Sequence, residues 1–173
     1  MAHLVRRVIR SGLLAGVAGT IAMDLLWFKR QRDEGSTTSF ADWEFGKGID
    51  TFDEAPAPAQ VGRIAARAVN VELPDSAAAL TNNVVHWSTG VTWGVAAAAL
   101  RPVPGIGAIK AGYIAAIAAW TTSYAVLPKI GVYKPITEYD GKTLWKDLSA
   151  HLVFGTAVGW TLALLGGRRR RRS

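Results

Sequence analysis

Three ionisable side chains, Asp24, His86 and His151, lie inside long stretches of otherwise uncharged residues. If those stretches cross a membrane, each charge is expensive, because a lipid-facing charge costs about 2.5 to 3.5 kcal/mol. A carboxylate and two imidazoles, which titrate near about pH 6.5, can carry protons, and they are also acceptable metal ligands. Their chemistry depends on the elements that bring them together.

Both histidines belong to a repeated pattern in which a polar residue, a histidine and two glycines follow one another at steps of four. The two copies are Asn82, His86, Gly90, Gly94 and Asp147, His151, Gly155, Gly159. This step places each set on one face of a helix. Two further stretches carry small residues at similar steps, namely Gly12, Gly16 and Thr20 before Asp24, and Ala108, Gly112, Ala115, Ala119 and Ser123.

These stripes predict how the helices pack. Lipid supplies no hydrophobic drive between helices, so small residues that allow close backbone approach hold them together. The predicted helix-packing positions are Gly12, Gly16, Gly90, Gly94, Gly112, Gly155 and Gly159. The stripes should therefore face inward and carry the ionisable groups into the interior.

Four apolar segments are each near the ~20 residues that a helix needs to cross a bilayer. They cover about residues 11–28, 80–100, 106–127 and 145–165. The predicted fold class is an all-α integral membrane four-helix bundle, forming one domain over residues 1–173. A cleavable signal peptide is the alternative for the first segment, although Asp24 and Trp27 lie where a small-residue cleavage site would belong.

Composition agrees with a membrane protein, since 50% of the residues are hydrophobic and only 19% are charged. The absence of cysteine excludes disulfides, thiolate metal sites and cysteine nucleophiles. Much of the net charge of +7 comes from one run, Arg168, Arg169, Arg170, Arg171 and Arg172. Because this basic tail, residues 168–173, follows an apolar helix, we expect it to bind anionic lipid headgroups rather than nucleic acid.

A polar loop over residues 29–79 separates the first two segments. Within it, apolar residues of the stretch Gln60 to Val69 share one helical face, with Arg63 and Arg67 to the side. This predicts a short helix that either lies on the membrane surface or caps the bundle. An even number of spans places both termini on one side, and their acid-free basic residues favour the cytoplasm, although the 20 Lys and Arg residues divide evenly between the two sides.

Helix arithmetic places the ionisable groups near one depth. With a rise of ~1.5 Å per residue, Asp24 lies about 6 Å from the outer end of its span and each histidine about 9 Å. The predicted intramembrane polar cluster consists of Asp24, Asn82, His86, Ser123, Tyr124, Asp147 and His151.

Three hypotheses for this cluster stay open. The first is that the cluster forms hydrogen bonds that hold the helices together in a structural or accessory membrane component. Each such contact contributes about 0.6 kcal/mol. The second is a proton or cation path through a conductor or transporter. The third is a haem or divalent metal held by His86 and His151, although no closely spaced histidine pair supports a metal site. We expect no enzyme, because phosphate loops, nucleophile elbows and paired catalytic carboxylates are all missing from the sequence.

The second half of the chain resembles the YagU-like family of small bacterial inner-membrane proteins. The resemblance rests on Asn83-Val-Val-His86-Trp with Gly90, on Ala111-Gly-Tyr-Ile and Leu127-Pro-Lys-Ile-Gly131, and on the stretch from Lys134-Pro to His151-Leu-Val. It covers roughly residues 80–160 and implies a multi-pass protein of the bacterial cytoplasmic membrane. The family supplies no substrate or catalytic residues. A bundle of this size also suggests a homo-oligomer or a membrane-protein partner.

Overall fold

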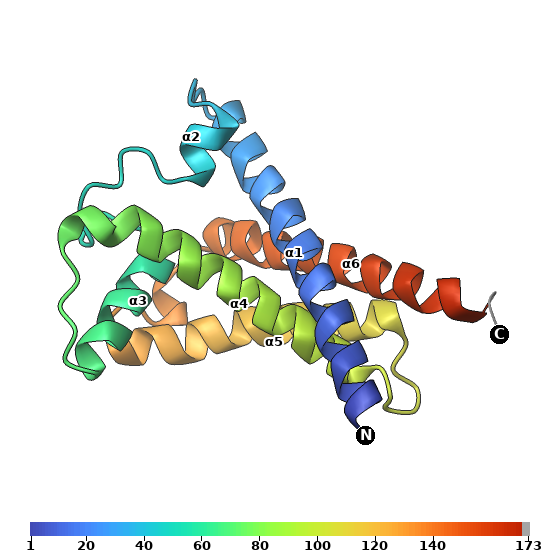
Figure 1. Ribbon diagram of the computed structural model, residues 1–173. Coiled ribbons are helices and arrows are strands. Elements are labelled where there is room, and N and C mark those ends of the chain that lie inside the picture. Colours follow the sequence, from blue (N-terminus) through green and yellow to red (C-terminus); the bar gives the residue numbers. More distant parts are fainter. Residues whose placement is uncertain (171–173) are drawn as a thin grey trace.

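The computed structural model describes the backbone of residues 1–170 and the side chains up to residue 166. Within this range the protein consists of helices and connecting loops, without β-strands, and the all-α prediction is confirmed there (Figure 1). The predicted basic tail, residues 168–173, lies outside the described side chains.

Helix α1 (Ala2–Asp33) is longer than the apolar segment that predicted it, residues 11–28. The sequence pattern marks only the uncharged part of the helix, whereas the flanking arginines and lysines are good helix formers and extend it at both ends. The buried positions of α1 are small or polar: Gly12, Ala15, Gly16, Gly19, Thr20 and Asp24. Its packed face is therefore the predicted stripe.

The segment after α1 contains two short helices. Helix α2 (Phe40–Glu44) begins after Ser39, whose side chain accepts a hydrogen bond from the backbone N–H of Asp42 at 3.1 Å. From the sequence we predicted a loop in this part, although a serine before a short apolar stretch is a common helix start. Helix α3 (Ala57–Ala68) begins three residues before the predicted helix Gln60 to Val69 and packs against α4.

The other long helices are α4 (Ala78–Leu100), α5 (Ala108–Val126) and α6 (Gly141–Arg170), with short 3-10 turns η1 (Asp75–Ala77), η2 (Leu127–Ile130) and η3 (Ile136–Glu138). Helices α4 and α5 lie within two residues of the predicted segments, whereas α6 extends beyond its segment at both ends. Gly105 and Gly131 adopt positive φ angles of 78° and 75° after α4 and η2. These left-handed positions favour glycine, and they turn the chain after each helix.

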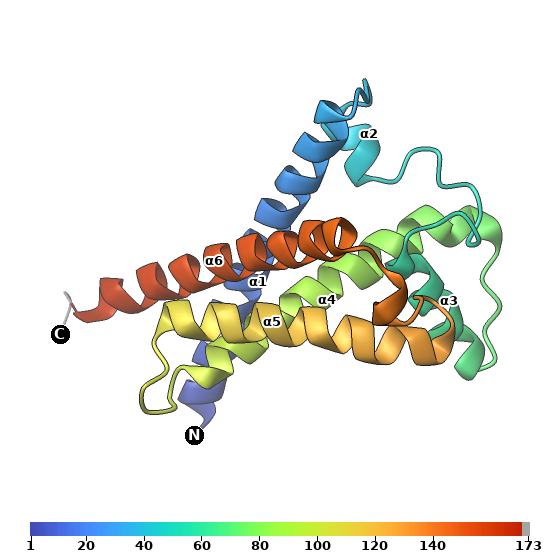
Figure 2. The same ribbon diagram turned by 180° about the vertical axis from the view of Figure 1, so that it is seen from behind.

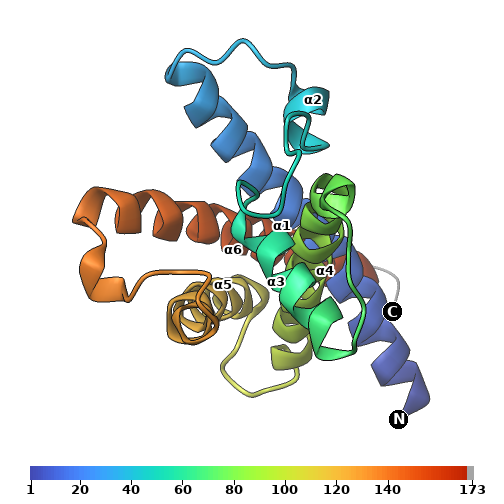
Figure 3. The same ribbon diagram turned by 90° about the vertical axis from the view of Figure 1, so that its left-hand side faces the viewer.

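Helix α1 packs against α4 and α6, and α5 packs against α6 and α4. Figures 1 and 2 show α1 crossing the other three long helices obliquely. The start of α1, the connection between α4 and α5 and the last turns of α6 gather at one end, which we name the terminal end. Figure 3 views the opposite end, the loop end, which carries α2, α3 and the start of α6.

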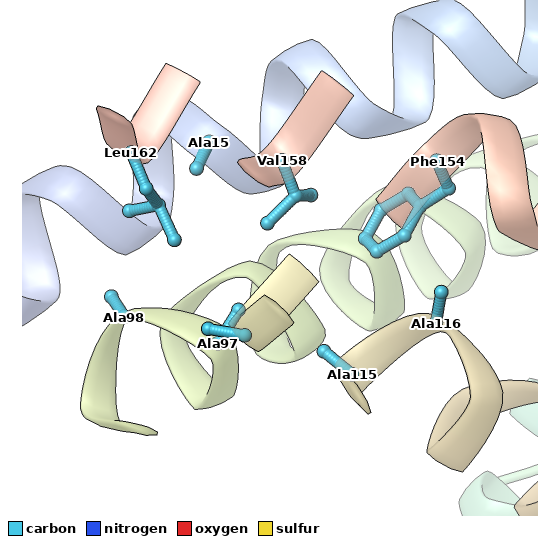
Figure 4. Close-up of a cluster of buried hydrophobic side chains, with 9 residues drawn as sticks. Ala15, Ala97, Ala98, Ala115, Ala116, Phe154, Val158 and Leu162 are labelled. Atoms are coloured by element: carbon cyan, nitrogen blue, oxygen red, sulfur yellow. The ribbon is translucent and has the colours of Figure 1, made fainter. Parts of the chain in front are cut away.

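The core between the long helices is built mainly from alanine and glycine. Eleven of the sixteen buried hydrophobic residues in the described part of the chain are alanines. Figure 4 shows Phe154, Val158 and Leu162 of α6 filling the remaining space against alanines of α1, α4 and α5. Larger apolar side chains point outward instead, among them Leu14, Val17, Ile21, Leu25, Leu80, Val84, Ile114, Ile117, Trp160 and Leu164.

Two helices in the described range, α1 and α6, are long and apolar enough to cross a membrane. Length and composition therefore support a membrane location. Helix α4 carries Asn82, Asn83 and His86, and α5 carries Lys110 and several hydroxyl groups, which lower the hydropathy of every 18-residue stretch of these two helices.

Candidate functional site

The interface between α1 and α4 is a contact between backbones. A methyl group added at Gly94 would lie 2.4 Å from the backbone of Gly16, and one added at Gly12 would lie 2.4 Å from the Cα of Val95. One turn further on, a methyl group at Gly90 would lie 2.0 Å from the hydroxyl of Thr20. Later residues of α1 contact earlier residues of α4, so the two helices are antiparallel. The glycines fix their register.

This register places Asp24 opposite His86. The Nε2 atom of His86 lies 2.8 Å from Oδ1 of Asp24. Asp24 is only 3% exposed, and its second carboxylate oxygen has no hydrogen-bond partner among the described residues. A ring that carries its proton on Nε2 donates this hydrogen bond to the carboxylate. This contact therefore joins α1 to α4.

Helix α2 contributes a second carboxylate on the loop-end side of this pair. Oε1 of Glu44 accepts a hydrogen bond of 2.8 Å from the indole N–H of Trp87, the residue after His86. Burial, and next the negative charge of Asp24, raise the pKa of Glu44. Glu44 therefore belongs electrostatically to the Asp24–His86 pair.

The interface between α5 and α6 repeats the backbone contact. A methyl group at Gly112 would lie 2.2 Å from the carbonyl oxygen of Gly155 and 2.8 Å from the backbone nitrogen of Gly159. A methyl group at Gly159 would lie 2.9 Å from the Cα of Ile109. These helices are also antiparallel, and the second copy of the repeat lies in their contact.

The second histidine has a different partner. Nδ1 of His151 lies 3.0 Å from the backbone carbonyl of Asp147 and 3.5 Å from its carboxylate, one turn earlier on the same helix. Because a carbonyl oxygen only accepts, Nδ1 is the donor in this contact. One carboxylate oxygen of Asp147 is buried without a partner in the described structure.

An aromatic cluster surrounds Asp147 at the loop end. The ring of Tyr124 lies 5.4 Å from that of Tyr133, 5.5 Å from that of Tyr139 and 5.0 Å from that of Trp120. Burial, and next the charge of Asp147, raise the pKa of Tyr133 to about 12. Tyr133 therefore stays protonated at neutral pH and is a hydrogen-bond donor or acceptor rather than a charged group.

The predicted cluster thus divides into two centres. Asp24 and His86 meet between α1 and α4, whereas Asp147 and His151 share α6, with Tyr124 beside them. Asn82 has a buried side-chain oxygen without a partner in the described part of the chain. Ser123 donates a hydrogen bond to the carbonyl of Ala119 on its own helix. Among the described residues, no hydrogen bond or ion pair joins the two centres.

The described side chains include no group of three or more His, Cys, Asp or Glu that is arranged to hold a metal ion. For the haem hypothesis, Nε2 of His86 faces Asp24 at 2.8 Å. An iron ligated through this nitrogen would have to displace Asp24.

Sequence reasoning missed three residues near these centres: Arg30, Glu44 and Trp87. Arg30 donates hydrogen bonds to the carbonyl of Lys146 at 2.6 Å and to the hydroxyl of Ser149 at 2.8 Å, which joins α1 to α6. Trp87 directly follows His86 in the sequence, and this adjacency could have indicated that it lies near the Asp24–His86 pair. Glu44 could not be found, because α2 was treated as loop.

Comparison with protein-family models, with curated proteins and with solved structures finds no match for this chain.

Proposed function

We propose that this chain is a multi-pass protein of the bacterial inner membrane, a structural or accessory component in which α1, α4, α5 and α6 cross the bilayer. In this proposal the Asp24–His86 pair fastens α1 to α4. The resemblance of residues 80–160 to the YagU-like family supports the location. The bilayer is the main partner, with anionic headgroups at the basic tail.

The distribution of side chains supports the membrane part of this proposal. Small residues fill the interior and large apolar residues face outward on all four long helices. A water-soluble bundle buries its large apolar residues instead, because their removal from water stabilises the fold. Helices that pack through glycine while exposing leucine, isoleucine and valine suit a hydrocarbon solvent.

The observation that carries the structural role is the close contact between the backbones of α1 and α4 next to the Asp24–His86 pair, which we name the α1–α4 seam. Gly12, Gly16 and Gly94 bring the two backbones into contact on the terminal-end side of Asp24. This contact leaves no room for water between the two backbones at these glycines. A proton can reach the pair from the loop end, but it cannot pass along this seam unless the helices separate.

A proton or cation conductor is the second candidate, and a specific observation favours it. Polar oxygens of Asp24, Asn82 and Asp147 are buried without partners in the described structure, all toward the loop end. Such oxygens accept a proton, a cation or water at low cost. In an open state these oxygens would line a path between the two helix pairs.

One experiment separates the two candidates. Membrane fractions washed with alkaline carbonate should retain the protein, and release by the wash would contradict the membrane proposal. Purified protein in liposomes should show no proton flux above empty liposomes across a pH gradient. Flux that is abolished by Asp24→Asn, in a variant that still inserts and folds, would instead establish the conductor.

A further inference from the structure

A separate cavity of about 190 Å³ lies at the loop end, between α1, α2 and the start of α6. It is lined by Trp27, Arg30, Gln31, Glu34, Trp43 and Lys146. It belongs to neither carboxylate–histidine centre, and it lies at the end opposite to the last described turns of α6.

The cavity walls are rigid and partly aromatic. Arg30 lies 5.1 Å above the ring of Trp27 and is fixed by its hydrogen bonds to Lys146 and Ser149 on α6. Trp43 packs against Phe28 and Phe40, with ring centroids 5.7 Å and 6.1 Å away. A site whose side chains are held by second contacts is preorganised for a ligand.

Charge defines the first requirement of a ligand. Arg30 and Lys146 contribute two positive charges, and Glu34, which accepts a hydrogen bond from Lys146, contributes one negative charge. The lining is therefore positive by one unit. Arginine and lysine together favour a phosphate, to which they make charge-assisted hydrogen bonds.

An unused acceptor defines the second requirement. The side-chain oxygen of Gln31 is buried and has no hydrogen-bond partner among the described residues. A buried acceptor without a donor costs about 1 to 3 kcal/mol, so a ligand that brings an O–H or N–H group would relieve that cost. A phosphate ester that also carries a hydroxyl group satisfies both requirements.

We propose that this cavity binds a glycerophosphate group, in the form of an anionic phosphatidylglycerol headgroup. The phosphate lies by Lys146 and Arg30, and a glycerol hydroxyl donates to Gln31. Tryptophans at this level match the position of headgroups, where amphipathic rings gather. The lipid as source rests on the proposed membrane location, whereas the chemistry of the cavity does not.

Because the basic tail also attracts anionic lipid, the test uses a full-length parent in which Arg168 to Arg172 are replaced by glutamine. The parent, purified in detergent and stripped of lipid, is titrated with mixed micelles of phosphatidylglycerol or phosphatidylcholine. Binding is read from tryptophan fluorescence and from the melting temperature. Phosphatidylcholine carries no donor and no net charge, so it should bind at least about tenfold more weakly.

Gln31→Leu should weaken phosphatidylglycerol binding about tenfold, since it removes one buried hydrogen bond. This variant loses no partner in the described structure, so it should fold normally. Lys142→Gln is the matched control, because Lys142 is exposed near the cavity but does not line it, and its affinity should equal that of the parent. Equal binding of the two lipids, or an unchanged affinity in Gln31→Leu, would overturn the proposal.

Soluble glycerol 3-phosphate distinguishes the two sources. Gln31-dependent binding of this ester without any response to phosphatidylglycerol would assign the cavity to a free metabolite and overturn the lipid headgroup. The carbonate wash reports separately on the membrane location, so failure of one proposal is not mistaken for failure of the other.

Discussion

The α1–α4 and α5–α6 interfaces are built from the same repeat, yet their histidines have different partners. In both, glycines at steps of four bring two antiparallel backbones into contact. His86 reaches across its interface to Asp24, whereas His151 turns back to the carbonyl of Asp147 on its own helix. The repeated residues set the distance between helices, and the opposite helix decides which hydrogen bond forms.

The difference has an energetic consequence. A hydrogen bond between helices is lost when the helices separate, whereas one within a helix is kept. The Asp24–His86 pair therefore contributes to the association of α1 with α4. His151 contributes mainly to the local geometry of α6.

The largest expected effect comes from closing the space between backbones. Gly94→Leu and Gly112→Leu should both prevent folding, because a side chain at either position would lie within 2.5 Å of backbone atoms that cannot move aside. Gly141→Leu is the control, since nothing lies within 4 Å of its side-chain position. Circular dichroism and size-exclusion chromatography in detergent measure the outcome, and folded Gly94→Leu protein would contradict the close contact.

Replacing the two histidines should show their unequal roles. His86→Leu leaves the Asp24 carboxylate buried without its partner and should lower the free energy of unfolding by about 3 kcal/mol. His151→Leu should lower it by about 1 kcal/mol or less, because its hydrogen bond lies within one helix. Denaturant titration in detergent measures both.

A double variant sharpens this prediction. Asp24→Leu with His86→Leu should recover most of the stability lost in His86→Leu alone, because no buried charge is left. Equal losses in the two single histidine variants would contradict the proposed difference between the interfaces.

A smaller effect tests the register of α1 against α4. Gly90→Ala should cost about 1 to 3 kcal/mol, because its methyl group would lie 2.0 Å from the hydroxyl oxygen of Thr20. Adding Thr20→Ala removes that oxygen, and the next neighbours lie 3.3 Å and 3.7 Å away. The double variant should therefore be more stable than Gly90→Ala, and simple additivity of the two losses would argue against this contact.

The smallest effect concerns Glu44 and pH. Its pKa is raised above the model-compound value of 4.5 in the folded state, so the folded protein binds more protons than the unfolded chain just above that value. Stability should therefore fall as the pH rises from 4.5 through the folded pKa. Glu44→Gln keeps an acceptor for Trp87 and should flatten this part of the profile, whereas Glu54→Gln, at an exposed position, should not.

The sequence predicted the helical architecture well, because hydrophobic runs and breakers are local properties. The turn at Arg101–Gly105 and the extents of α4 and α5 lie within two residues of the prediction. The ends of α1 and α6 were misplaced, since an apolar run ends at the first charge whereas a helix continues through it. Helix α2 was missed because five residues carry too little periodicity.

The candidate centres were only partly predictable. The spacing of small residues, and the depth of a residue along its helix, indicate which positions can face inward. Depth alone does not predict which helix lies opposite. Asp24, His86 and His151 were therefore grouped into one cluster, whereas in the structure His86 pairs with Asp24 and His151 pairs with the carbonyl of Asp147 on its own helix. Glu44 lies near the first centre because of the path that the segment between α1 and α4 takes over the bundle. No local sequence pattern predicts that path.

The alanine and glycine interior also affects what association of the helices costs. Burying a leucine or methionine between helices restricts its side-chain rotamers, whereas alanine and glycine have no rotamers to lose. In a bilayer the helices are already formed before they associate, so the backbone entropy of glycine is not lost again at that step. The α1–α4 and α5–α6 interfaces can therefore form from weak contacts alone, because their association costs the chain almost no conformational entropy.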